Sequence, residues 1–590
     1  MKRSVLRRAA SGALDWPTAL PAVLRRVYAR RALASADELD LRLERLLPLS
    51  SLVSATPAIE RLLAAHARGE RVLVVGDFDA DGATSTALVV RQLRRLGFVE
   101  PGYVVPDRFR FGYGLSPPIV RLAAERRPQL LVTVDNGVAS LEGVAEANRL
   151  GIDVVVTDHH LPSAELPAAA AIVNPNLTGE PFESKALAGV GVAFYVMAAL
   201  THRMRALGHP AAASANPAEL LDLVALGTVA DLVPLDFNNR ILVAHGLKRI
   251  RAGRCVPGLR ALFEIAGRKL ASLAASDLGF QAGPRLNAAG RLEDMGEGIA
   301  CLLTDDPQEA RARAERLDRL NRDRREVEAK MQGEALEQLQ ARLLATEAQL
   351  PAGLALFDPG WHQGVVGLVA SRLKDRVHRP VIAFAPGEPG WLKGSARSVP
   401  GVHIRDVLDA LVKREPRLIE RFGGHAMAAG LTIAQDRFGD FTRCFAAEVA
   451  RWVDPASLRG ELYTDGELLP GEFGVDTAVA LRDAGPWGSA FPEPCFDGRF
   501  GVLESRTLGE RHLKLRLRAG SGELVDAIAF RHFDEPAALA VRPQDTLGLV
   551  YRTAVDEYSG ARRMQLIVEF LAGGDDFLPG VSNPGPAVRP

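Results

Sequence analysis

The sequence predicts an α/β protein in which a parallel sheet comes first, a smaller α/β segment second and a group of all-β strands last. Three observations predict this order. Short β-branched runs alternate with helical segments from about residue 55, a helical pattern of about 40 residues begins near residue 306, and alternating strand patterns follow residue 455. Continuous apolar strands that alternate with helices are typical of a parallel sheet covered on both faces.

Length and composition narrow the class of protein. A chain of 590 residues is too long for one hydrophobic core, so we expect three or four domains. The 72 basic and 72 acidic residues cancel, which argues mildly against a protein that coats nucleic acid but allows a local basic groove. The four cysteines are far apart, which favours reduced thiols over a disulfide framework or a zinc ribbon. With no apolar run of about 20 residues, we expect a cytoplasmic protein without a membrane span.

The first part of the chain is expected to begin with a helical lead-in over residues 1–50, which are rich in Arg, Leu and Ala. A domain with a βα rhythm follows over residues 51–300, with helices such as Ser85–Leu96 and Leu141–Leu150 between its strands. The predicted strands are Arg71–Val75, Gly102–Val105, Leu130–Val134, Asp153–Thr157 and Ala171–Val173.

A long connecting helix is predicted within residues 301–350. Asp306 and Pro307 are a typical N-cap and first turn, and helical apolar spacing continues to about Thr346. Its other face is rich in arginine, for which ion pairs with nearby acidic residues and a DNA-facing role are equal alternatives. These arginines are Arg311, Arg313, Arg316, Arg319, Arg322 and Arg324.

The remaining residues divide into three segments. A smaller α/β segment over residues 351–455 contains the strand-like runs Leu354–Phe357 and Val381–Phe384. Residues 456–575 are β-rich and predict a small barrel or sandwich. Residues 576–590 are weakly apolar and rich in proline, so we expect a disordered tail. The strands predicted in the β-rich segment are His512–Arg518, Leu524–Phe530, Thr546–Tyr551 and Met564–Phe570.

Acidic residues and histidines follow the predicted parallel strands. Ligands gather at the carboxyl ends of such strands, so we expect these side chains at one edge of the sheet, joined by Asp231 from the end of an apolar helix. Clustered carboxylates repel one another unless cations neutralise them, which predicts two Mg²⁺ or Mn²⁺ ions about 3.5–4 Å apart that activate water and stabilise a departing oxygen. Histidine favours manganese. The residues that follow strands are Asp77, Asp79, Asp81, Asp135, Asp158, His159 and His160.

Each of these motifs, taken alone, also has a simpler structural interpretation. An aspartate after a strand is often a turn or helix cap, the run Asp77–Asp81 could be a calcium-type loop, and adjacent histidines such as His159 and His160 are often structural. Their occurrence in order on successive βα units favours the metal site.

The same segments resemble the DHH phosphoesterases. Residues 74–82, 133–137 and 157–160 are similar to the first three motifs of that superfamily, Asp158-His159-His160 is its namesake triplet, and Asp231 matches the fourth motif. Residues 105–115, 283–291 and 361–373 resemble the RecJ family within it. Residues 394–398 and 422–425 resemble the DHH-associated C-terminal domain, and residues 484–494 resemble the start of the family's OB-fold.

The resemblance covers roughly residues 50–570 and implies a domain order. It implies a parallel-sheet DHH domain over residues 51–300, the long connecting helix, a smaller α/β DHH-associated domain over 351–455 and an all-β OB-fold over 456–575. Two positions depart from the usual pattern. Val75 stands where some superfamily members place a metal-binding histidine, and Ala490-Phe491 stands where Gly-Asn is more usual.

The resemblance also implies roles for the site residues. It implies direct metal ligation by Asp79, Asp81, Asp135, His159 and Asp231. It implies that Asp77 either binds a metal or orients a residue that does, and that His160 either contacts the scissile phosphate or orients a ligand. Asp158 is also expected to be catalytic. The cofactor would be two Mn²⁺ or Mg²⁺ ions. The residues expected to bind phosphate or DNA are Arg108, Arg285, Asn287, Ser371, Arg372, Ser395, Arg397 and His425, of which His425 could instead only pack against a glycine turn.

The implied activity is 5′-to-3′ exonucleolytic hydrolysis of single-stranded DNA to mononucleotides, in recombination and repair. The OB-fold would bind along the DNA strand, because Lys514, Arg516 and Arg518 alternate with core leucines.

We expect a monomer, and the family suggests single-strand binding protein and a RecQ-type helicase as partners. The alternatives are a phosphodiesterase for short oligonucleotides or cyclic dinucleotides, a non-catalytic single-strand-binding replication scaffold and, least favoured, a pyrophosphatase. The β-rich segment after residue 455 favours the nuclease.

Overall fold

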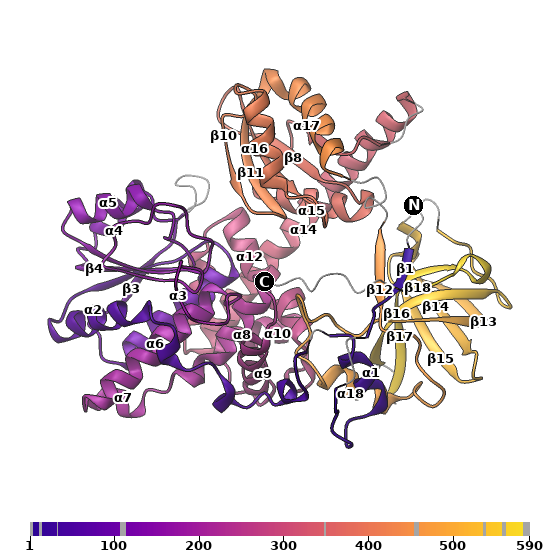
Figure 1. Cartoon of the computed structure of the whole chain (residues 1–590), viewed down its shortest axis with the longest axis horizontal. Helices are drawn as coiled ribbons and strands as arrows, with labels where there is room; N and C mark the ends of the chain where they lie inside the picture. The colour runs from indigo at the N-terminus through magenta and orange to yellow at the C-terminus, as the bar shows by residue number, and fades with distance from the viewer. Residues whose placement is uncertain are drawn as a thin grey trace. The chain divides into compact units, whose positions relative to one another are not determined.

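The structure is a computed structural model that describes residues 4–10, 14–31, 33–106, 114–346, 350–453, 460–534, 538–556 and 562–581. The chain forms two compact units (Figure 1). One contains residues 5–318 together with the residues from Tyr463 onward, and the other contains Ser4 and residues 319–462. Among the described residues, we find no helix whose length and apolar character would let it cross a membrane.

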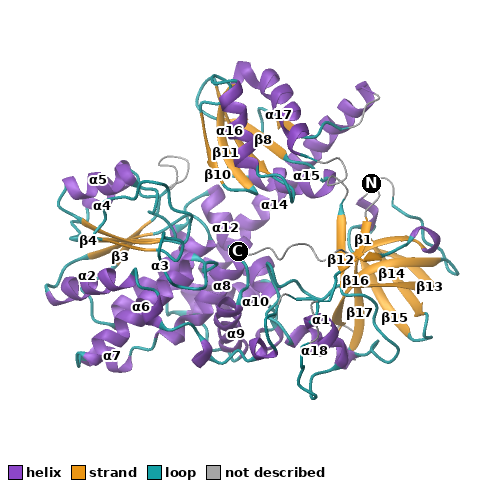
Figure 2. Ribbon diagram, in the orientation of Figure 1, coloured by secondary structure: helices purple, strands orange, loops and turns teal. Residues whose placement is uncertain are grey.

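The first unit contains the predicted parallel sheet. Five strands pair in the order β3-β2-β4-β5-β6, and every neighbouring pair is parallel. Figure 2 shows this sheet between the surrounding helices. The strands are apolar along their whole length because helices cover both faces, and all five residues of β4 are buried. The sequence-based strand ranges are confirmed to within one residue at each end. The strands are β2 (Val72–Val75), β3 (Gly102–Val104), β4 (Leu130–Val134), β5 (Asp153–Thr157) and β6 (Ala171–Val173).

Helices cover this sheet and extend the domain beyond it. α4 and α5 pack against one another over a core that includes Ile119, Leu131 and Val144. α3 is buried over most of its length because it packs against α6 and α8. The helices up to this point are α2 (Ala55–Ala67), α3 (Ala80–Arg95), α4 (Pro117–Ala124), α5 (Leu141–Arg149), α6 (Gly189–Ala206), α7 (Pro210–Ser214), α8 (Leu221–Ala230) and α9 (Phe237–Arg251).

The long helix α14 spans Pro307–Thr346, as the sequence predicted. Its apolar stripe is buried, and four of the six arginines named above form ion pairs with glutamates. The paired alternative therefore holds for Arg311, Arg313, Arg316 and Arg324. The boundary between the two compact units falls inside α14, so most of the helix belongs to the second unit. The elements before it are α10 (Pro257–Ile265), α11 (Ala275–Asp277), the π-helical turn η6 (Leu278–Ala282), α12 (Gly283–Leu292) and α13 (Gly296–Leu303).

The second unit is built on a five-stranded sheet of order β10-β11-β9-β8-β7. β7 and β8 are parallel, and the other pairs are antiparallel. Its core contains Phe384, Phe441 and Phe445. The elements are β7 (Leu354–Phe357), α15 (Val366–Val377), β8 (Val381–Pro386), β9 (Trp391–Arg397), α16 (Ile404–Arg414), β10 (Arg421–Gly424), β11 (Ala428–Ala434) and α17 (Phe438–Trp452).

The β-rich segment closes into a barrel of order β13-β14-β15-β17-β16, preceded by α18 (Val475–Asp483). Leu513, Leu515 and Leu517 of β14 point into the core, whereas Lys514 and Arg516 are only half-buried. The first strand, β13, was not among the predicted ones. The barrel strands are β13 (Phe496–Leu508), β14 (His512–Ala519), β15 (Leu524–Ala529), β16 (Thr546–Asp556) and β17 (Arg563–Gly573).

Both ends of the chain correct the sequence-based expectation. The lead-in contains the helix α1 (Ala22–Tyr28), but it begins with the strand β1 (Ser4–Arg7) and continues in short 3-10 turns. β1 lies between β12 (Glu461–Thr464) and β18 (Gly580–Val581), so it forms by pairing with distant segments. The tail was expected to be disordered from residue 576, yet Phe577 is buried. Residues 582–590 lie outside the described part of the chain.

Candidate metal centre

The loop after β2 delivers the first acidic side chains. Asp79 is the N-cap of α3, and its carboxylate accepts a hydrogen bond from the Gly82 N–H at 3.0 Å. Asp77 lies buried under the same turn. A Cβ atom on Gly82 would lie 2.6 Å from the Cβ of Asp77, so this close turn needs a glycine. The tight loop therefore fixes where both carboxylates stand.

Asp81 and Asp135 lie where α6 begins. The Asp81 carboxylate accepts hydrogen bonds from the Gly189 and Val190 N–H groups at 2.7 and 2.9 Å. A Cβ on Gly189 would lie 2.6 Å from the Cβ of Asp135, so glycine lets α6 approach this closely. Asp135 itself follows β4 with a φ of 61°, in the left-handed region that aspartate tolerates better than most residues. Both carboxylates are therefore held against the edge of the sheet.

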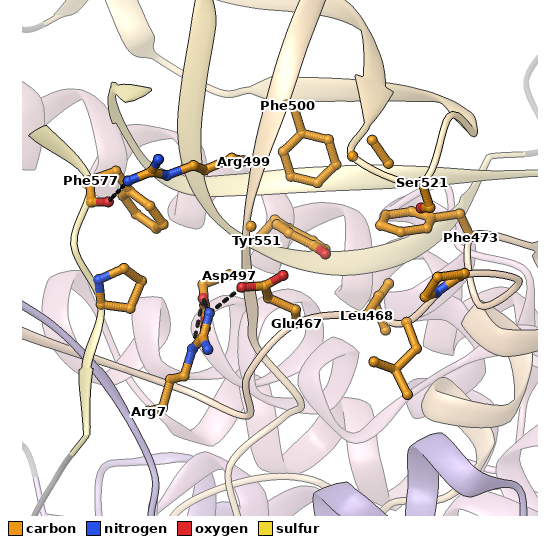
Figure 3. Close-up of a pocket in the computed structure, with 16 residues that line it drawn as sticks. Arg7, Glu467, Leu468, Phe473, Asp497, Arg499, Phe500, Ser521, Tyr551 and Phe577 are labelled. Carbon is orange, nitrogen blue, oxygen red and sulfur yellow. Dashed lines mark hydrogen bonds and ion pairs between the residues drawn. The ribbon is translucent and has the colours of Figure 1, made fainter. Parts of the chain in front are cut away.

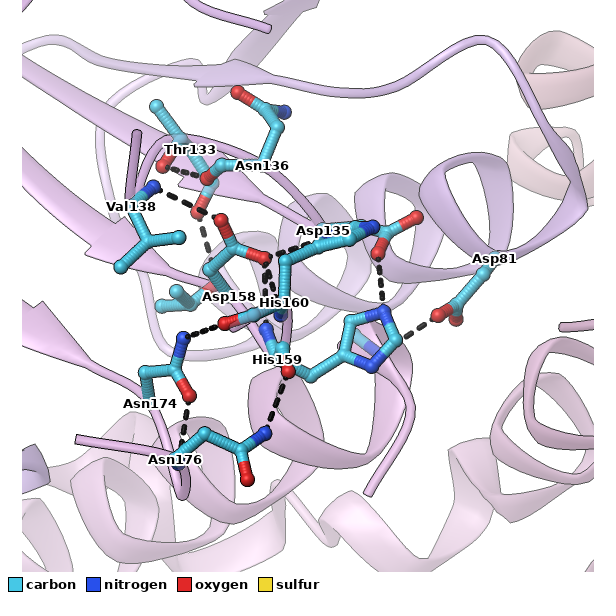
Figure 4. A network of polar contacts seen from close by, with 12 residues as sticks. Asp81, Thr133, Asp135, Asn136, Val138, Asp158, His159, His160, Asn174 and Asn176 are labelled. Carbon is cyan, nitrogen blue, oxygen red and sulfur yellow. Dashed lines mark hydrogen bonds and ion pairs between the residues drawn. The ribbon is translucent and has the colours of Figure 1, made fainter. Parts of the chain in front are cut away.

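His159 brings the remaining ligands together (Figure 4). Its Nε2 lies 3.1 Å from Asp135 Oδ1 and 3.5 Å from Asp231 Oδ2, and Asp231 caps the C-terminal end of α8. Three sets of residues place potential ligand atoms within 4.8 Å of one another, and together they contain every predicted metal ligand. The sets are Asp135-His159-His160, Asp81-His159-Asp231 and Asp77-Asp79-Asp135.

The cluster concentrates negative charge in a buried place. Burial and the neighbouring charge of Asp79 raise the pKa of Asp81 to about 7. Burial, together with repulsion from Asp81 and Asp79, also holds the pKa values of Asp135 and Asp231 well above their usual range. Carboxylates that resist ionisation in this way need a counter-charge, and oxygen ligands with one or two imidazoles suit Mn²⁺ or Mg²⁺. The donor set therefore fits the predicted ions.

Asp158 holds His160 in place. Its carboxylate accepts hydrogen bonds from the Val138 N–H at 2.9 Å and the His159 N–H at 2.7 Å, and His160 Nδ1 lies 2.7 Å from Oδ1. Burial alone would raise the pKa of Asp158, but these hydrogen bonds outweigh it and lower the pKa. Burial likewise opposes the protonation of His160, yet Asp158 raises its pKa. These contacts fix the orientation of His160, and the catalytic role predicted for Asp158 stays a prediction.

Two asparagines that sequence reasoning missed support the histidines from β6. Asn174 Nδ2 donates to the His160 carbonyl at 2.8 Å, and Asn176 Nδ2 donates to the His159 carbonyl at 2.7 Å (Figure 4). Both follow β6 in the same way as the acidic residues follow β2, β4 and β5. Their place after a predicted strand was the signal that could have identified them.

The α12 residues that are predicted to bind phosphate or DNA contact neighbouring elements of the same unit. Asn287 Oδ1 accepts a hydrogen bond from the Ala80 N–H at 2.7 Å, at the start of α3. The Arg285 side chain is buried and pairs with Asp318 of α14 at 3.0 Å. These contacts join α12 to its neighbours, and phosphate or DNA binding by Arg285 and Asn287 stays a prediction. Arg108 lies outside the described residues.

The predicted phosphate ligands of the second unit meet at one end of its sheet. Arg397 donates to Ser395 Oγ at 3.0 Å, and Arg397 pairs in register with Ala428, three residues after His425. A Cβ on Gly367 of α15 would lie 2.9 Å from an Arg397 nitrogen, and Ser371 lies one helical turn further along. The fifth candidate, Arg372, departs from this group, because it pairs with Glu328 of α14 at 3.1 Å.

A separate pocket of about 350 Å³ lies on the barrel and belongs to a structural joint (Figure 3). Arg7 of β1 reaches into it and pairs with Asp497 and Glu467. Arg499 donates to the Phe577 carbonyl at 3.0 Å on its other side. The pocket therefore lies where the two ends of the chain attach to the barrel, away from the metal cluster.

Comparisons with known proteins agree with this geometry. The DHH family, N-terminal domain matches residues 71–228, the DHHA1 domain matches residues 349–451 and the RecJ OB domain matches residues 464–569. The chain is 53% identical to the "Single-stranded-DNA-specific exonuclease RecJ" of Dickeya dadantii over 573 residues, which are 96% of this chain and 98% of that protein. It is 52% identical to the protein of the same name from Escherichia coli over 570 residues, which are 95% of this chain and 98% of that protein.

Solved structures resemble the whole chain as well. The crystal structure of RecJ in complex with Mn²⁺ from Thermus thermophilus matches with a TM-score of 0.77 and 32% identity, over 98% of this chain and 80% of that one. The Mg²⁺ complex of RecJ from the same organism matches with a TM-score of 0.71 and 30% identity, over 96% of this chain and 78% of that one. With matching domains in the same order and half of its residues identical to those of its relatives, the chain belongs to the RecJ family of DHH phosphoesterases.

Proposed function

We propose that the protein is a 5′-to-3′ exonuclease that hydrolyses single-stranded DNA to mononucleotides with two Mn²⁺ or Mg²⁺ ions, in DNA recombination and repair. One observation carries the proposal. Five aspartates and two histidines, spread over more than 150 residues of sequence, meet in one cluster, in a chain whose relatives are named single-stranded-DNA-specific exonucleases.

The residues of the cluster divide the chemical work. Asp77, Asp79, Asp81, Asp135, His159 and Asp231 would hold the ions. When bound, such ions activate water and neutralise charge on a phosphoester. His160, whose pKa is raised, favours the cationic ring that suits an anionic phosphate, and Asp158 fixes its orientation.

The second unit offers a surface for phosphate. Ser395 and Arg397 lie on the half-exposed face of β9, and the register places Gly430 of β11 beside Ser395. A Cβ on Gly430 or on its partner Gly423 would meet no atom within 4 Å, so side chains leave this strip of sheet open. A nucleotide could approach the backbone closely there, beside the arginine. A phosphate-binding surface of this kind supports selection of the 5′ end.

The barrel supports the tracking of a longer strand. Its outer face carries a groove of about 580 Å³ with four cationic side chains and two carboxylates. Basic grooves on OB-folds bind the backbone of single strands. The four cations are Arg506, Lys514, Arg516 and Arg563.

The test uses the purified protein, Mn²⁺ and three matched oligonucleotides. These are a 5′-phosphorylated single strand, the same strand with a blocked 5′ end, and a blunt duplex, with release of mononucleotides followed over time. We expect rapid loss of the first substrate alone, and no loss with Asp135→Ala. Cleavage of dinucleotides or cyclic dinucleotides in place of the strand would favour the small-substrate phosphodiesterase. Binding without cleavage would favour the scaffold.

The resemblance also supports three finer proposals: a monomeric state, a cytoplasmic location, and single-strand binding protein and a RecQ-type helicase as partners. Light scattering of the purified protein tests the first, and fractionation of cells tests the second. Co-purification from cells with each partner tests the third, with a chain that lacks the barrel as the comparison.

A further inference from the structure

The metal cluster is partly open at Asp231 and at His160. The Asp135 side chain is 3% exposed and that of His159 is 13% exposed, whereas that of Asp231 is 24% exposed and that of His160 is 32% exposed. One open side of the cluster therefore lies at the C-terminal end of α8, where Asp231 stands. A substrate that reaches the cluster in this unit can contact the residues beside Asp231.

An exposed leucine stands directly beside this opening. Leu232 follows Asp231 and is 71% exposed. Its φ is 62°, in the left-handed region where glycine or asparagine costs less than leucine. Exposed leucines alone need no explanation, but strained residues cluster at functional sites. Leu232 combines exposure, strain and a position next to a metal ligand.

A second exposed apolar side chain lies on the neighbouring element. Phe280, also 71% exposed, belongs to the π-helical turn η6, a type of turn that is frequent at functional sites. η6 packs against the last turn of α8, since a Cβ on Gly279 would lie 3.3 Å from Val229. The buried Arg285 donates to the Gln281 carbonyl at 2.7 Å, which holds this turn rigidly.

The loop that carries Leu232 leads from the cluster to the barrel. At its far end, the Leu235 N–H donates to the Ser489 carbonyl at 2.8 Å, in the segment that precedes β13. A Cβ on Gly488 would lie 2.7 Å from the Leu235 side chain, so the two segments are in close contact. A strand that passes from the barrel to the metals would run along this loop.

We propose that Leu232 and Phe280 form an apolar platform that contacts the bases of the single strand next to the scissile phosphate. The proposal rests on the proposed function and deepens it. The metals and cations of the site offer contacts to phosphates, whereas the faces of the bases need apolar or aromatic partners. Such contacts do not depend on base identity, because every base has a π face. The two residues are positioning residues that align the phosphate with the cluster.

The experiment compares normal 5′-phosphorylated strands with strands whose first two nucleotides are abasic. The variants are Phe280→Ala, Leu232→Ala and Leu232→Gly, and Leu207→Ala at the end of α6, 53% exposed, is the matched control. Initial rates give kcat and KM for each pair, and thermal melts show that each variant is folded.

We expect Phe280→Ala to lower kcat/KM on normal DNA by about 5- to 150-fold, the range for loss of one base-stacking contact. The wild type should lose a similar factor on abasic DNA, and the variant should lose little more, because the contact is already absent. Leu232→Gly, which suits the backbone, should lose as much as Leu232→Ala. Leu207→Ala should match the wild type.

The outcomes separate the platform from the proposed function. If the wild type degrades both substrates equally well, or if each variant loses the same factor on both, the platform is wrong while the exonuclease stands. Retention of activity in Leu232→Gly but not in Leu232→Ala would assign the effect to the loop backbone and also overturn the platform. If the wild type degrades neither strand, the proposed function itself fails.

Discussion

The metal edge of the first unit and the sheet of the second unit use similar elements in different ways. In the first, side chains that follow parallel strands converge with Asp231 from the end of α8, so Asp81, Asp135 and Asp231 repel one another in a buried place. In the second, β9 presents Lys393 and Arg397 along one face, where every second side chain recurs at about 6.8 Å. Carboxylates that converge create a strong local electric field, which suits the binding of cations and catalysis. Cationic side chains that are spread along a strand suit an extended anionic ligand.

The largest expected effect is that of a substitution in the metal cluster of the first unit. Asp135→Asn removes a proposed metal ligand, and asparagine accepts the left-handed backbone of this position. We expect the exonuclease rate to fall on the order of 1,000-fold or more. Because the raised pKa means that the ionised carboxylate costs stability at neutral pH, we also expect the metal-free variant to gain about 1–2 kcal/mol.

Nuclease assays with Mn²⁺ and denaturant melts in EDTA measure the two effects of Asp135→Asn. Added Mn²⁺ should raise the melting temperature of the wild type by several degrees and that of the variant much less. A variant that is less stable than the wild type in EDTA would show that the cluster is not under repulsion.

The next prediction concerns the β9 face of the second unit. Arg397→Ala should raise KM by about 10- to 100-fold with little change in kcat, since a charge-assisted contact to phosphate is lost. Arg397→Lys should recover part of the loss, and Lys413→Ala, an exposed cation of α16, is the control. The stabilisation by Mn²⁺ should be unchanged. A fall in kcat at constant KM would place Arg397 in the chemical step and remove the contrast between the two regions.

A smaller effect is expected from the asparagines that support the histidines. Asn174→Ala should lower both Mn²⁺ affinity and kcat by about 10-fold, the lower part of the range for groups that orient metal ligands. Asn148→Ala is the matched control, because its side chain also donates to a backbone carbonyl, that of Ala168, on an exposed part of the same domain. Titration of activity with Mn²⁺ separates the effect on Mn²⁺ affinity from the effect on kcat. Equal behaviour of both variants would show that the asparagines only stabilise the fold.

The smallest effect concerns the barrel groove. Lys514→Ala should weaken binding of long single strands a few-fold and reduce the slope of log K against log salt by about 0.7, as expected for one phosphate contact. Arg511→Ala removes a cation that already pairs with Asp534 and should leave the slope unchanged. Fluorescence titrations at several salt concentrations measure both. An unchanged slope for Lys514→Ala would exclude this groove from the strand's path.

The sequence by itself determined the elements that depend on local pattern. The five parallel strands and the limits of α14 match their predicted ranges, because apolar periodicity and capping act within a few residues. It also predicted which acidic residues and histidines lie close together. The carboxyl ends of parallel strands meet at one edge of a sheet, so residues after β2, β4 and β5 come together whatever the connections between them.

Only the tertiary structure decided which partner each polar side chain takes. Arg285 and Asn287 are residue types that suit phosphate, but packing of α12 gives them Asp318 and the Ala80 N–H as partners. The strands β1 and β18 pair although they are far apart in the sequence. Because each strand forms through this distant pairing, the sequence around it does not predict it. Hydrogen-bond partners depend on contacts between distant segments, and these are settled only when the segments pack and exclude water.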